Sequence, residues 1–192
     1  MKRSSSVTGS DAKTLTVDIS TGAILATVVL RDENERLPWF LTRCREMGVT
    51  KFLAVDNGST DGSLDFLLSQ PDVHLWQTAM SFNESNFDSA WFEILLSKYG
   101  LGHWTLMLDV DEILMFPGSE ERTLSEFSQS VETRGKVAAS GLMLDMYDDS
   151  HVSITHYRRG DDFLSHCPYF DRTTHHAEYP NYSPEQLRVP VV

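Results

Sequence analysis

The most constraining feature of the sequence is a short apolar run that ends in three carboxylates. Residues 105–108, Thr-Leu-Met-Leu, precede Asp109, Asp111 and Glu112. A run this short and this apolar predicts a buried strand of a parallel sheet. In open α/β sheets ligands bind outside the carboxyl ends of the strands, so the acidic side chains are expected to face a ligand. A solvated strand end or a helix N-cap ahead of Ile113 is the simpler alternative.

The spacing of Asp109 and Asp111 allows both carboxylates to reach one centre at a strand end. Hard oxygen ligands of this kind suit Mg²⁺ or Mn²⁺. The apolar runs on either side bury their neighbours, and an uncompensated acidic cluster is costly in such surroundings. This cost favours a metal or nucleotide site, with Asp109 and Asp111 as metal ligands, over the simpler alternative.

The residues before this run predict the rest of an α/β fold. A strand, a helix and a strand in close succession form a βαβ unit, whose strands are parallel. Asp56 ends the second strand and is therefore expected at the same sheet edge as Asp109. We expect Asn34 to cap the first helix and Gly48 to close it. The predicted elements are strands at 23–30, 51–56, 73–76 and 136–147, and helices at 37–47, 63–69, 86–99 and 123–134.

Composition narrows the classes of partner. The chain has 192 residues, which fits one domain with a real core, and a formal net charge of -12, which argues against a nucleic-acid partner. A nucleotide diphosphate remains compatible with this charge if a divalent cation screens its phosphates. Cys44 and Cys167 lie far apart and predict neither a disulfide framework nor a zinc site.

The two ends of the chain carry weaker patterns. Residues 1–22 are Ser/Thr-rich without clear periodicity and predict a flexible leader. The apolar run at 23–30 is too short to span a bilayer, so we expect no transmembrane segment and a cytoplasmic protein, with peripheral membrane contact left open. Residues 151–192 show little periodicity, which indicates an extended tail or a fold that is cut short.

Three motifs together resemble a known family. They are Val28 to Glu35, with Arg31 and Glu33; Val55 to Ser63, Val-Asp-Asn-Gly-Ser-Thr-Asp-Gly-Ser; and Leu108 to Glu112, Leu-Asp-Val-Asp-Glu. They are similar to the nucleotide-sugar-binding signatures of family 2-like glycosyltransferases with the GT-A fold. The helix sequence Leu-Pro-Trp-Phe-Leu at 37–41 and the pair His103-Trp104 resemble a bacterial branch of that family. The resemblance covers residues 23–118.

This resemblance implies a fold and an activity. The fold would be an α/β, three-layer GT-A sandwich with a mostly parallel central sheet, made of a nucleotide-binding half at 23–118 and an incomplete acceptor half at 119–192. The activity would be transfer of a sugar from a nucleotide-diphosphate sugar donor to a hydroxyl of a saccharide or lipid-linked acceptor. The reaction would depend on Mn²⁺ or Mg²⁺ and is expected to be inverting.

The resemblance also implies roles for single residues. Asp56 would accept a hydrogen bond from the base, and Arg31 and Glu33 would line the pocket for base and ribose. Asp109 would lie near the ribose or the sugar. Asp111 would bind the metal that bridges the diphosphate. Glu112 could help to hold the metal or cap the next turn, and the cap, or a place beside the metal ligands that supports them, is slightly favoured.

Two further predictions concern the base pocket and the acceptor side. Asn57 stands where many family members carry a second Asp, so the base pocket is expected to be rearranged around it. An inverting transferase needs a general base, and Asp161 and Asp162 are the candidates. Acidic pairs in such stretches are more often ordinary turns. The wider set of acids in this half is Asp145, Asp148, Asp149, Asp161 and Asp162.

Two alternative functions stay open. The chain ends where relatives of this kind continue, so it could be a truncated nucleotide-sugar-binding remnant without transferase activity. The sequence Leu-Met-Leu-Asp109-Val-Asp111 is also similar to the nucleophile strand of haloacid-dehalogenase-type phosphatases. In that case Asp109 would attack phosphorus, Asp111 would act as acid and base, and Lys136 would be the later lysine.

Overall fold

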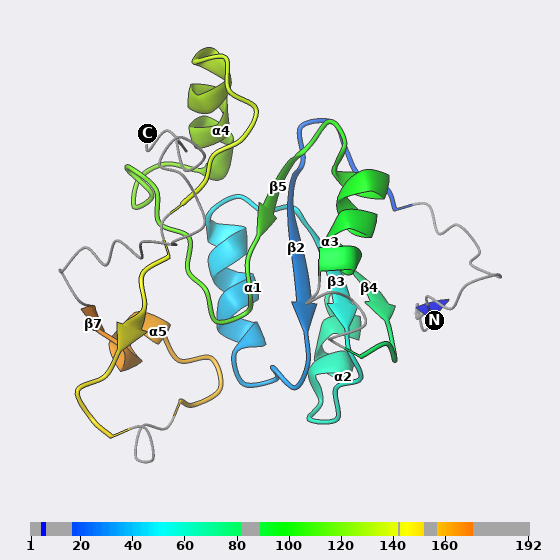
Figure 1. The fold of residues 1–192 in the computed structure, drawn as a ribbon, viewed down its shortest axis with the longest axis vertical. Coiled ribbons are helices and arrows are strands. Elements are labelled where there is room, and N and C mark those ends of the chain that lie inside the picture. Colours follow the sequence, from blue (N-terminus) through cyan, green and yellow to red (C-terminus); the bar gives the residue numbers. More distant parts are fainter. Residues whose placement is uncertain (1–4, 7–16, 82–88, 142, 152–156, 171–192) are drawn as a thin grey trace, which may run out of the picture.

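The fold is built on a parallel sheet in the order β1-β4-β3-β2-β5, in which every neighbouring pair is parallel. The computed structural model describes residues 5–6, 17–81, 89–141, 143–151 and 157–170 (Figure 1). The strands of this sheet are β1 (Ser5–Ser6), β2 (Ile24–Leu30), β3 (Lys51–Asp56), β4 (Val73–Gln77) and β5 (Trp104–Met107). The protein is therefore α/β, with the all-parallel strands β4, β3, β2 and β5 at its centre.

Helices flank this sheet, and a small antiparallel ribbon follows it. The helices are α1 (Leu37–Glu46), α2 (Ser63–Leu68), α3 (Ser89–Leu95), the π-helix η1 (Leu96–Gly100), α4 (Leu124–Thr133) and α5 (Phe163–His166). The ribbon pairs β6 (Met146–Tyr147) with β7 (Tyr169–Phe170). The helix predicted at 86–99 is thus present from Ser89, and its first residues lie outside the described part of the chain.

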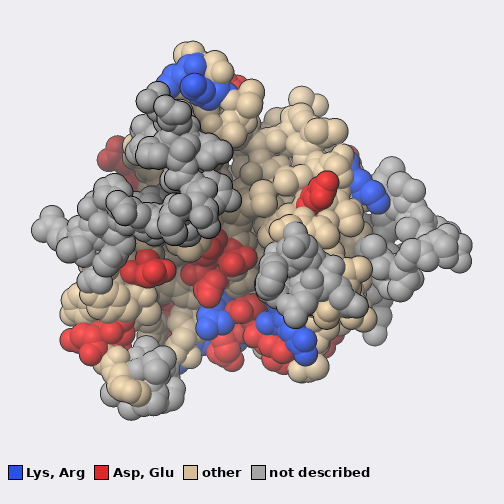
Figure 2. Space-filling view, in the orientation of Figure 1, with Lys and Arg blue, Asp and Glu red and all other residues tan. Residues whose placement is uncertain are grey.

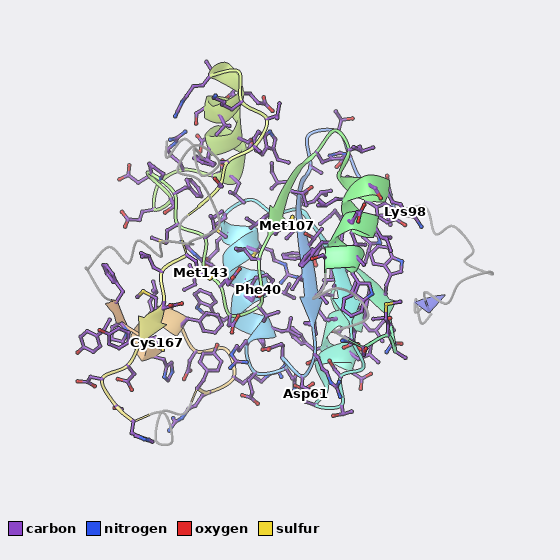
Figure 3. The ribbon with its side chains drawn as sticks, in the orientation of Figure 1. Phe40, Asp61, Lys98, Met107, Met143 and Cys167 are labelled. Carbon is purple, nitrogen blue, oxygen red and sulfur yellow. The ribbon has the colours of Figure 1, made fainter. Side chains whose placement is uncertain are left out.

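Strand β2 is apolar throughout because both of its faces are covered. Its even-numbered residues, such as Ala26 and Val28, belong to the core cluster that contains Phe40 of α1. Its odd-numbered Leu25 belongs to a second cluster with Trp91 of α3. Figure 1 shows α1 and α3 on either side of β2, and Figure 3 shows Phe40 on α1. Helices on both faces explain the continuous apolar run by which the sequence predicted this strand.

Helix α1 begins without the predicted cap. Its N-cap residue is Arg36, and no side chain caps it, so the prediction for Asn34 was wrong. The Asn34 amide nitrogen instead donates to the Asp61 carbonyl at 3.0 Å, because the neighbouring loop lies within its reach. Gly48 follows the helix with φ 103°, as predicted for a closing residue that must adopt a left-handed backbone.

Strand β5 is less buried than its composition predicted. Three of its four residues are half-buried, and Met107 is 47% exposed. The reason is its place at the end of the sheet, where β2 is its one neighbour in the described part of the chain. An apolar sequence predicts a strand, but whether a second neighbour covers it is a property of the tertiary fold.

The strand predicted at 136–147 was largely wrong. Among its described residues, Met146–Tyr147 alone form a strand, and Val137 is 92% exposed in irregular chain. A strand needs a hydrogen-bonded neighbour, and the described structure provides one, β7, at the end of this stretch.

Parts of the predicted leader take part in the fold. Ser5–Ser6 pair with Trp76 and Gln77 at the outer edge of β4, and Val17 and Ile19 pack against the cluster around Trp91. Residues 1–4 and 7–16 lie outside the described residues. No helix in the described part of the chain is long and apolar enough to cross a membrane.

Candidate functional site

A polar cavity of about 280 Å³ lies where the strand order of the sheet reverses. The chain passes from β2 to β3 and β4 on one side and then returns to place β5 on the other side of β2. In open α/β sheets the crevice at such a switch point, outside the carboxyl ends of the strands, is where ligands bind. The cavity occupies this crevice, and its lining residues are Val29, Leu30, Arg31, Glu33, Asn57, Asp109, Val110 and Asp111.

Most of the residues predicted from the sequence are brought together here. Residues after β2 and β3 supply Arg31, Glu33 and Asn57, and the turn after β5 supplies Asp109 and Asp111. Figure 2 shows acidic and basic side chains gathered together on this face. Three predicted residues, Asp56, Asp161 and Asp162, do not line the cavity.

Asp56 is fully buried at the end of β3. Both carboxylate oxygens lie 3.3 Å from the Ser59 N–H, and Gln77 Nε2 donates to one of them at 3.4 Å. The carboxylate thus holds the turn between Asp56 and Ser59. Asn57 is the residue of this turn that lines the cavity.

The turn after β5 presents its carboxylates on either side of a buried anchor. Val110 is 3% exposed and belongs to the core, whereas Asp109 and Asp111 reach solvent in the cavity. The Glu112 carboxylate accepts the Asp109 N–H at 3.0 Å, and the Glu112 N–H donates to the Asp109 carbonyl at 3.1 Å. Glu112 therefore closes the turn 109–112 that carries both aspartates, rather than capping the turn that follows.

Three carboxylates gather at this turn, those of Asp109, Asp111 and Glu112. Partial burial, followed by the charges of Glu112 and Asp111, raises the pKa of Asp109 above its usual range. A raised carboxylate pKa means that the ionised form is disfavoured where it stands. A cation that joined Asp109 and Asp111 would remove this penalty, so the electrostatics of the turn favour cation binding.

The protein supplies only part of a metal-binding set. Within the residues that the structure describes, no group of three or more His, Cys, Asp or Glu side chains could hold a metal ion. Two carboxylates in an open cavity nevertheless fit Mg²⁺ or Mn²⁺. Mg²⁺ in particular usually takes one or two carboxylates and completes its shell with substrate phosphates and water.

Arg36 carries the charge that sequence reasoning missed. Its guanidinium donates to the Glu33 carboxylate at 2.7 Å. The pKa of Arg36 is raised first by this hydrogen bond, with smaller contributions from the charges of Glu33, Asp111 and Tyr157. Arg36 thus links the two flanks of the cavity electrostatically. The sequence signal was its spacing of three residues from Glu33, which places the two side chains on neighbouring positions of a helical turn.

The two general-base candidates have different environments beside the start of α1. Asp162 caps α5 by accepting the Leu164 N–H at 3.1 Å, which is the ordinary turn role. Asp161 lies 2.9 Å from His166 Nε2 through its carboxylate. The two aspartates belong to a segment that packs on α1, where the Gly160 N–H donates to the Glu35 carbonyl at 3.1 Å.

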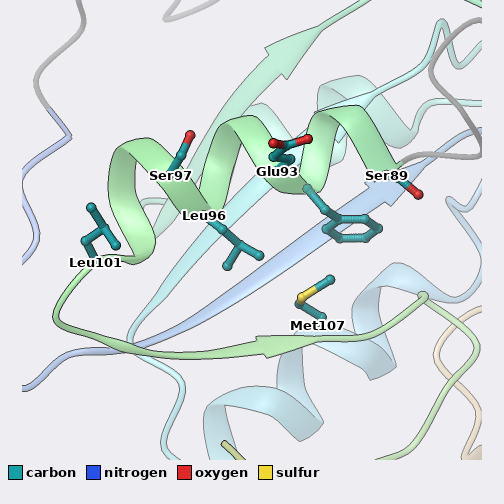
Figure 4. Close-up of a pocket in the computed structure, with 7 residues that line it drawn as sticks. Ser89, Glu93, Leu96, Ser97, Leu101 and Met107 are labelled. Atoms are coloured by element: carbon teal, nitrogen blue, oxygen red, sulfur yellow. The ribbon is translucent and has the colours of Figure 1, made fainter. Parts of the chain in front are cut away.

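A second hollow, of about 490 Å³, is apolar and has a different character. It lies between α3, η1 and β5, where Leu96 and Met107 face each other across the gap (Figure 4). Among the described residues that line it, Glu93 alone is titratable. With so few polar groups to orient a reacting ligand, this hollow is a weaker candidate for chemistry than the polar cavity.

No family model and no curated protein matches the chain. Function therefore rests on the site. Lys136, which the phosphatase alternative requires, is exposed just beyond α4 and does not line the cavity.

Proposed function

We propose that the protein is a metal-dependent glycosyltransferase that moves a sugar from a nucleotide-diphosphate sugar to an acceptor hydroxyl. The observation that carries the proposal is the polar cavity at the switch point between β2 and β5. One flank of this cavity offers groups suited to a nucleoside, and the other offers the carboxylate pair Asp109 and Asp111. A nucleotide diphosphate bound with a divalent cation matches both flanks.

The carboxylate flank would hold the metal and the diphosphate. Asp109 and Asp111 would bind Mn²⁺ or Mg²⁺, and the ion would supply stabilisation of the charge that develops on the leaving diphosphate. The Arg31 guanidinium lies on the opposite flank, where it pairs with the Asp32 carboxylate at 3.6 Å and stays 65% exposed, so it remains accessible to the ribose of a bound nucleoside.

The nucleoside flank would recognise base and ribose. Asn57 offers both an amide donor and a carbonyl acceptor, which suit the edge of a base. Glu33 offers a carboxylate acceptor for ribose hydroxyls, and Arg36 holds that carboxylate in place. The fully buried Asp56 would support this flank by holding the turn that carries Asn57.

Deprotonation of the acceptor would come from the segment that packs on α1. Asp161 is the better candidate of the two, because Asp162 already serves as the cap of α5. The His166 imidazole at 2.9 Å from Asp161 would orient that carboxylate toward a saccharide or lipid-linked acceptor. The product would be inverted if the acceptor attacks the face opposite the leaving diphosphate.

The test is the release of nucleotide from a panel of UDP- and GDP-linked sugars, in Mn²⁺ and in EDTA, with saccharide acceptors added. We expect metal-dependent release for the wild type and its loss in Asp111→Ala. Glu120→Ala is the matched control, because it removes an exposed carboxylate outside the cavity. Binding of the donor without release or transfer under any condition would favour the non-catalytic remnant instead.

A further inference from the structure

Two loops beside the cavity hold each other through side-chain to backbone hydrogen bonds. One is the loop 31–34, which lies between β2 and α1, and the other is the segment 59–63, which leads from β3 into the first residue of α2. In the first loop, Arg31 and Glu33 line the cavity. The alternate residues, Asp32 and Asn34, form hydrogen bonds with the second segment. The direction of the two cavity residues therefore depends on how the loops are joined.

Asp61 is the centre of this junction. One carboxylate oxygen accepts the Asn34 N–H at 2.8 Å. The other accepts the N–H and the hydroxyl of Ser63, at 2.9 and 2.6 Å. The Ser63 oxygen in turn accepts the Glu33 N–H at 2.9 Å. Asp61 thus fixes the backbone of Asn34 directly and that of Glu33 through Ser63.

The charge state of Asp61 fits this role. Burial alone would raise its pKa, but the hydrogen bonds from Ser63 and Asn34 outweigh burial and lower the pKa below the usual range. Hydrogen bonds to an ionised acceptor are shorter and stronger than neutral ones. Figure 3 shows Asp61 beyond the end of β2. The cavity lies at the same end of this strand, because Leu30, the last residue of β2, lines it.

The junction is reciprocal, because the first loop also bonds back to the second. The Asp32 carboxylate accepts the Thr60 N–H at 2.7 Å, and the Asp32 N–H donates to Ser59 Oγ at 2.9 Å. Asp32 adopts φ 57°, a left-handed conformation that is unfavourable for a residue with a side chain. A backbone in this conformation persists where surrounding contacts determine it, and these bonds supply such contacts.

Gly62 shows how closely the loops approach. Its φ of 100° suits glycine, and a Cβ at this position would lie 3.2 Å from the Asn34 amide nitrogen. A third segment, distant in the sequence, also contacts Asn34, because the Arg159 guanidinium donates to the Asn34 carbonyl at 2.7 Å. The loop 31–34 is therefore held from two sides.

We propose that Asp61 is a positioning residue that sets the backbone of Glu33 and Asn34, so that Arg31 and Glu33 face a bound nucleoside. The inference rests on the proposed function, because it takes the ligand of the cavity to be a nucleotide. It adds that Asp61 affects binding at the nucleoside flank and leaves binding at the metal flank unchanged. The bonds described for Asp109 are made within its own turn and involve neither loop.

The test compares two probes in calorimetric titrations, UDP with Mn²⁺ and pyrophosphate with Mn²⁺. Asp61→Ala is expected to weaken UDP binding about tenfold or more, because it removes charge-assisted bonds that orient the nucleoside flank. Pyrophosphate binding should stay within about twofold of the wild type, because pyrophosphate contacts the metal flank alone. Asp61→Asn keeps the size of the side chain and one acceptor oxygen, so its affinity for UDP should lie between those of the wild type and Asp61→Ala.

The matched control is Asp65→Ala, which removes an exposed carboxylate from helix α2, four residues after Asp61 and outside the junction. Equal loss of UDP and pyrophosphate binding in Asp61→Ala, or loss of neither, would overturn the positioning role. A wild type that binds neither probe would overturn the proposed function instead. Amide hydrogen exchange then decides on Asp61: faster exchange at Glu33 and Asn34 in Asp61→Ala supports the inference, and unchanged exchange overturns it.

Discussion

Replacing Asp109 by Asn should separate stability from ligand binding. The carboxylate stands in partly buried surroundings beside Glu112 and Asp111, and its pKa is raised for these reasons. Asparagine keeps the size of the side chain and the backbone N–H that Glu112 accepts. The substitution therefore removes one charge and leaves the turn in place. We expect Asp109→Asn to be more stable than the wild type in EDTA and unable to gain stability from metal and nucleotide.

The magnitude follows from the two like charges. Exposed like-charge pairs cost about 0.3–0.5 kcal/mol each, so relief of two such pairs amounts to about 0.5–1 kcal/mol after solvent screening. In a protein of this size that is a rise in Tm of about 1–4 °C. With Mn²⁺ and UDP at about 100 times Kd, the wild type should gain about 2.7 kcal/mol and overtake the variant.

The sign of the pH dependence is an independent check. Because the folded protein holds the Asp109 proton more tightly than the unfolded chain does, ionisation of this group costs folding free energy. The advantage of Asp109→Asn should be full at neutral pH and should shrink as the pH falls through the raised pKa. Thermal unfolding from pH 7 to pH 4, in EDTA, measures it. A variant that is less stable than the wild type in EDTA, or that still gains stability from Mn²⁺ and UDP, would refute the reasoning.

Two further predictions concern contacts elsewhere in the fold. Asp72→Asn should lower the free energy of unfolding by about 1 kcal/mol at pH 7, because the Arg45 hydrogen bond and charge lower the pKa of Asp72 and stabilise its ionised form. The difference should vanish as the pH falls from about 4 through that lowered pKa, in urea titrations at several pH values. Thr123→Ala breaks the capping box with Glu126 at the start of α4 and should lower the free energy of unfolding by about 1 kcal/mol. Ser125→Ala, two residues later and not at the cap, should lower it by less. Equal urea midpoints for Thr123→Ala and the wild type would contradict the role of the cap.

Local patterns predicted the central elements well because their causes are local. Residues 51–56 were predicted as a strand and form β3 with the same bounds, since an apolar run between turn residues leaves few other choices. The capping box at Thr123 was likewise readable, because both partners lie within four residues of each other. The parallel βαβ connection likewise predicted that Asp56 and Asp109 lie at one edge of the sheet, and both stand at the carboxyl ends of parallel strands.

The remaining features depend on contacts between distant segments. Asn34 is a residue type that often caps helices, but here it forms hydrogen bonds with Asp61 and Arg159 and does not cap α1. The apolar run before Asp109 predicts a strand, but it does not predict that this strand lies at the end of the sheet. The interaction of Arg36 with the charge of Asp111 joins residues that the chain separates widely, so spacing revealed only its bond to Glu33.

The most direct test of the central claim is calorimetric titration of the wild-type protein with UDP and with GDP, each in Mn²⁺ and again in EDTA. The account predicts that at least one nucleotide binds in Mn²⁺ and that this binding is lost in EDTA and in Asp111→Ala. Unchanged nucleotide affinity in Asp111→Ala would contradict the metal assignment. Absence of binding to either nucleotide in both conditions would contradict the donor site itself.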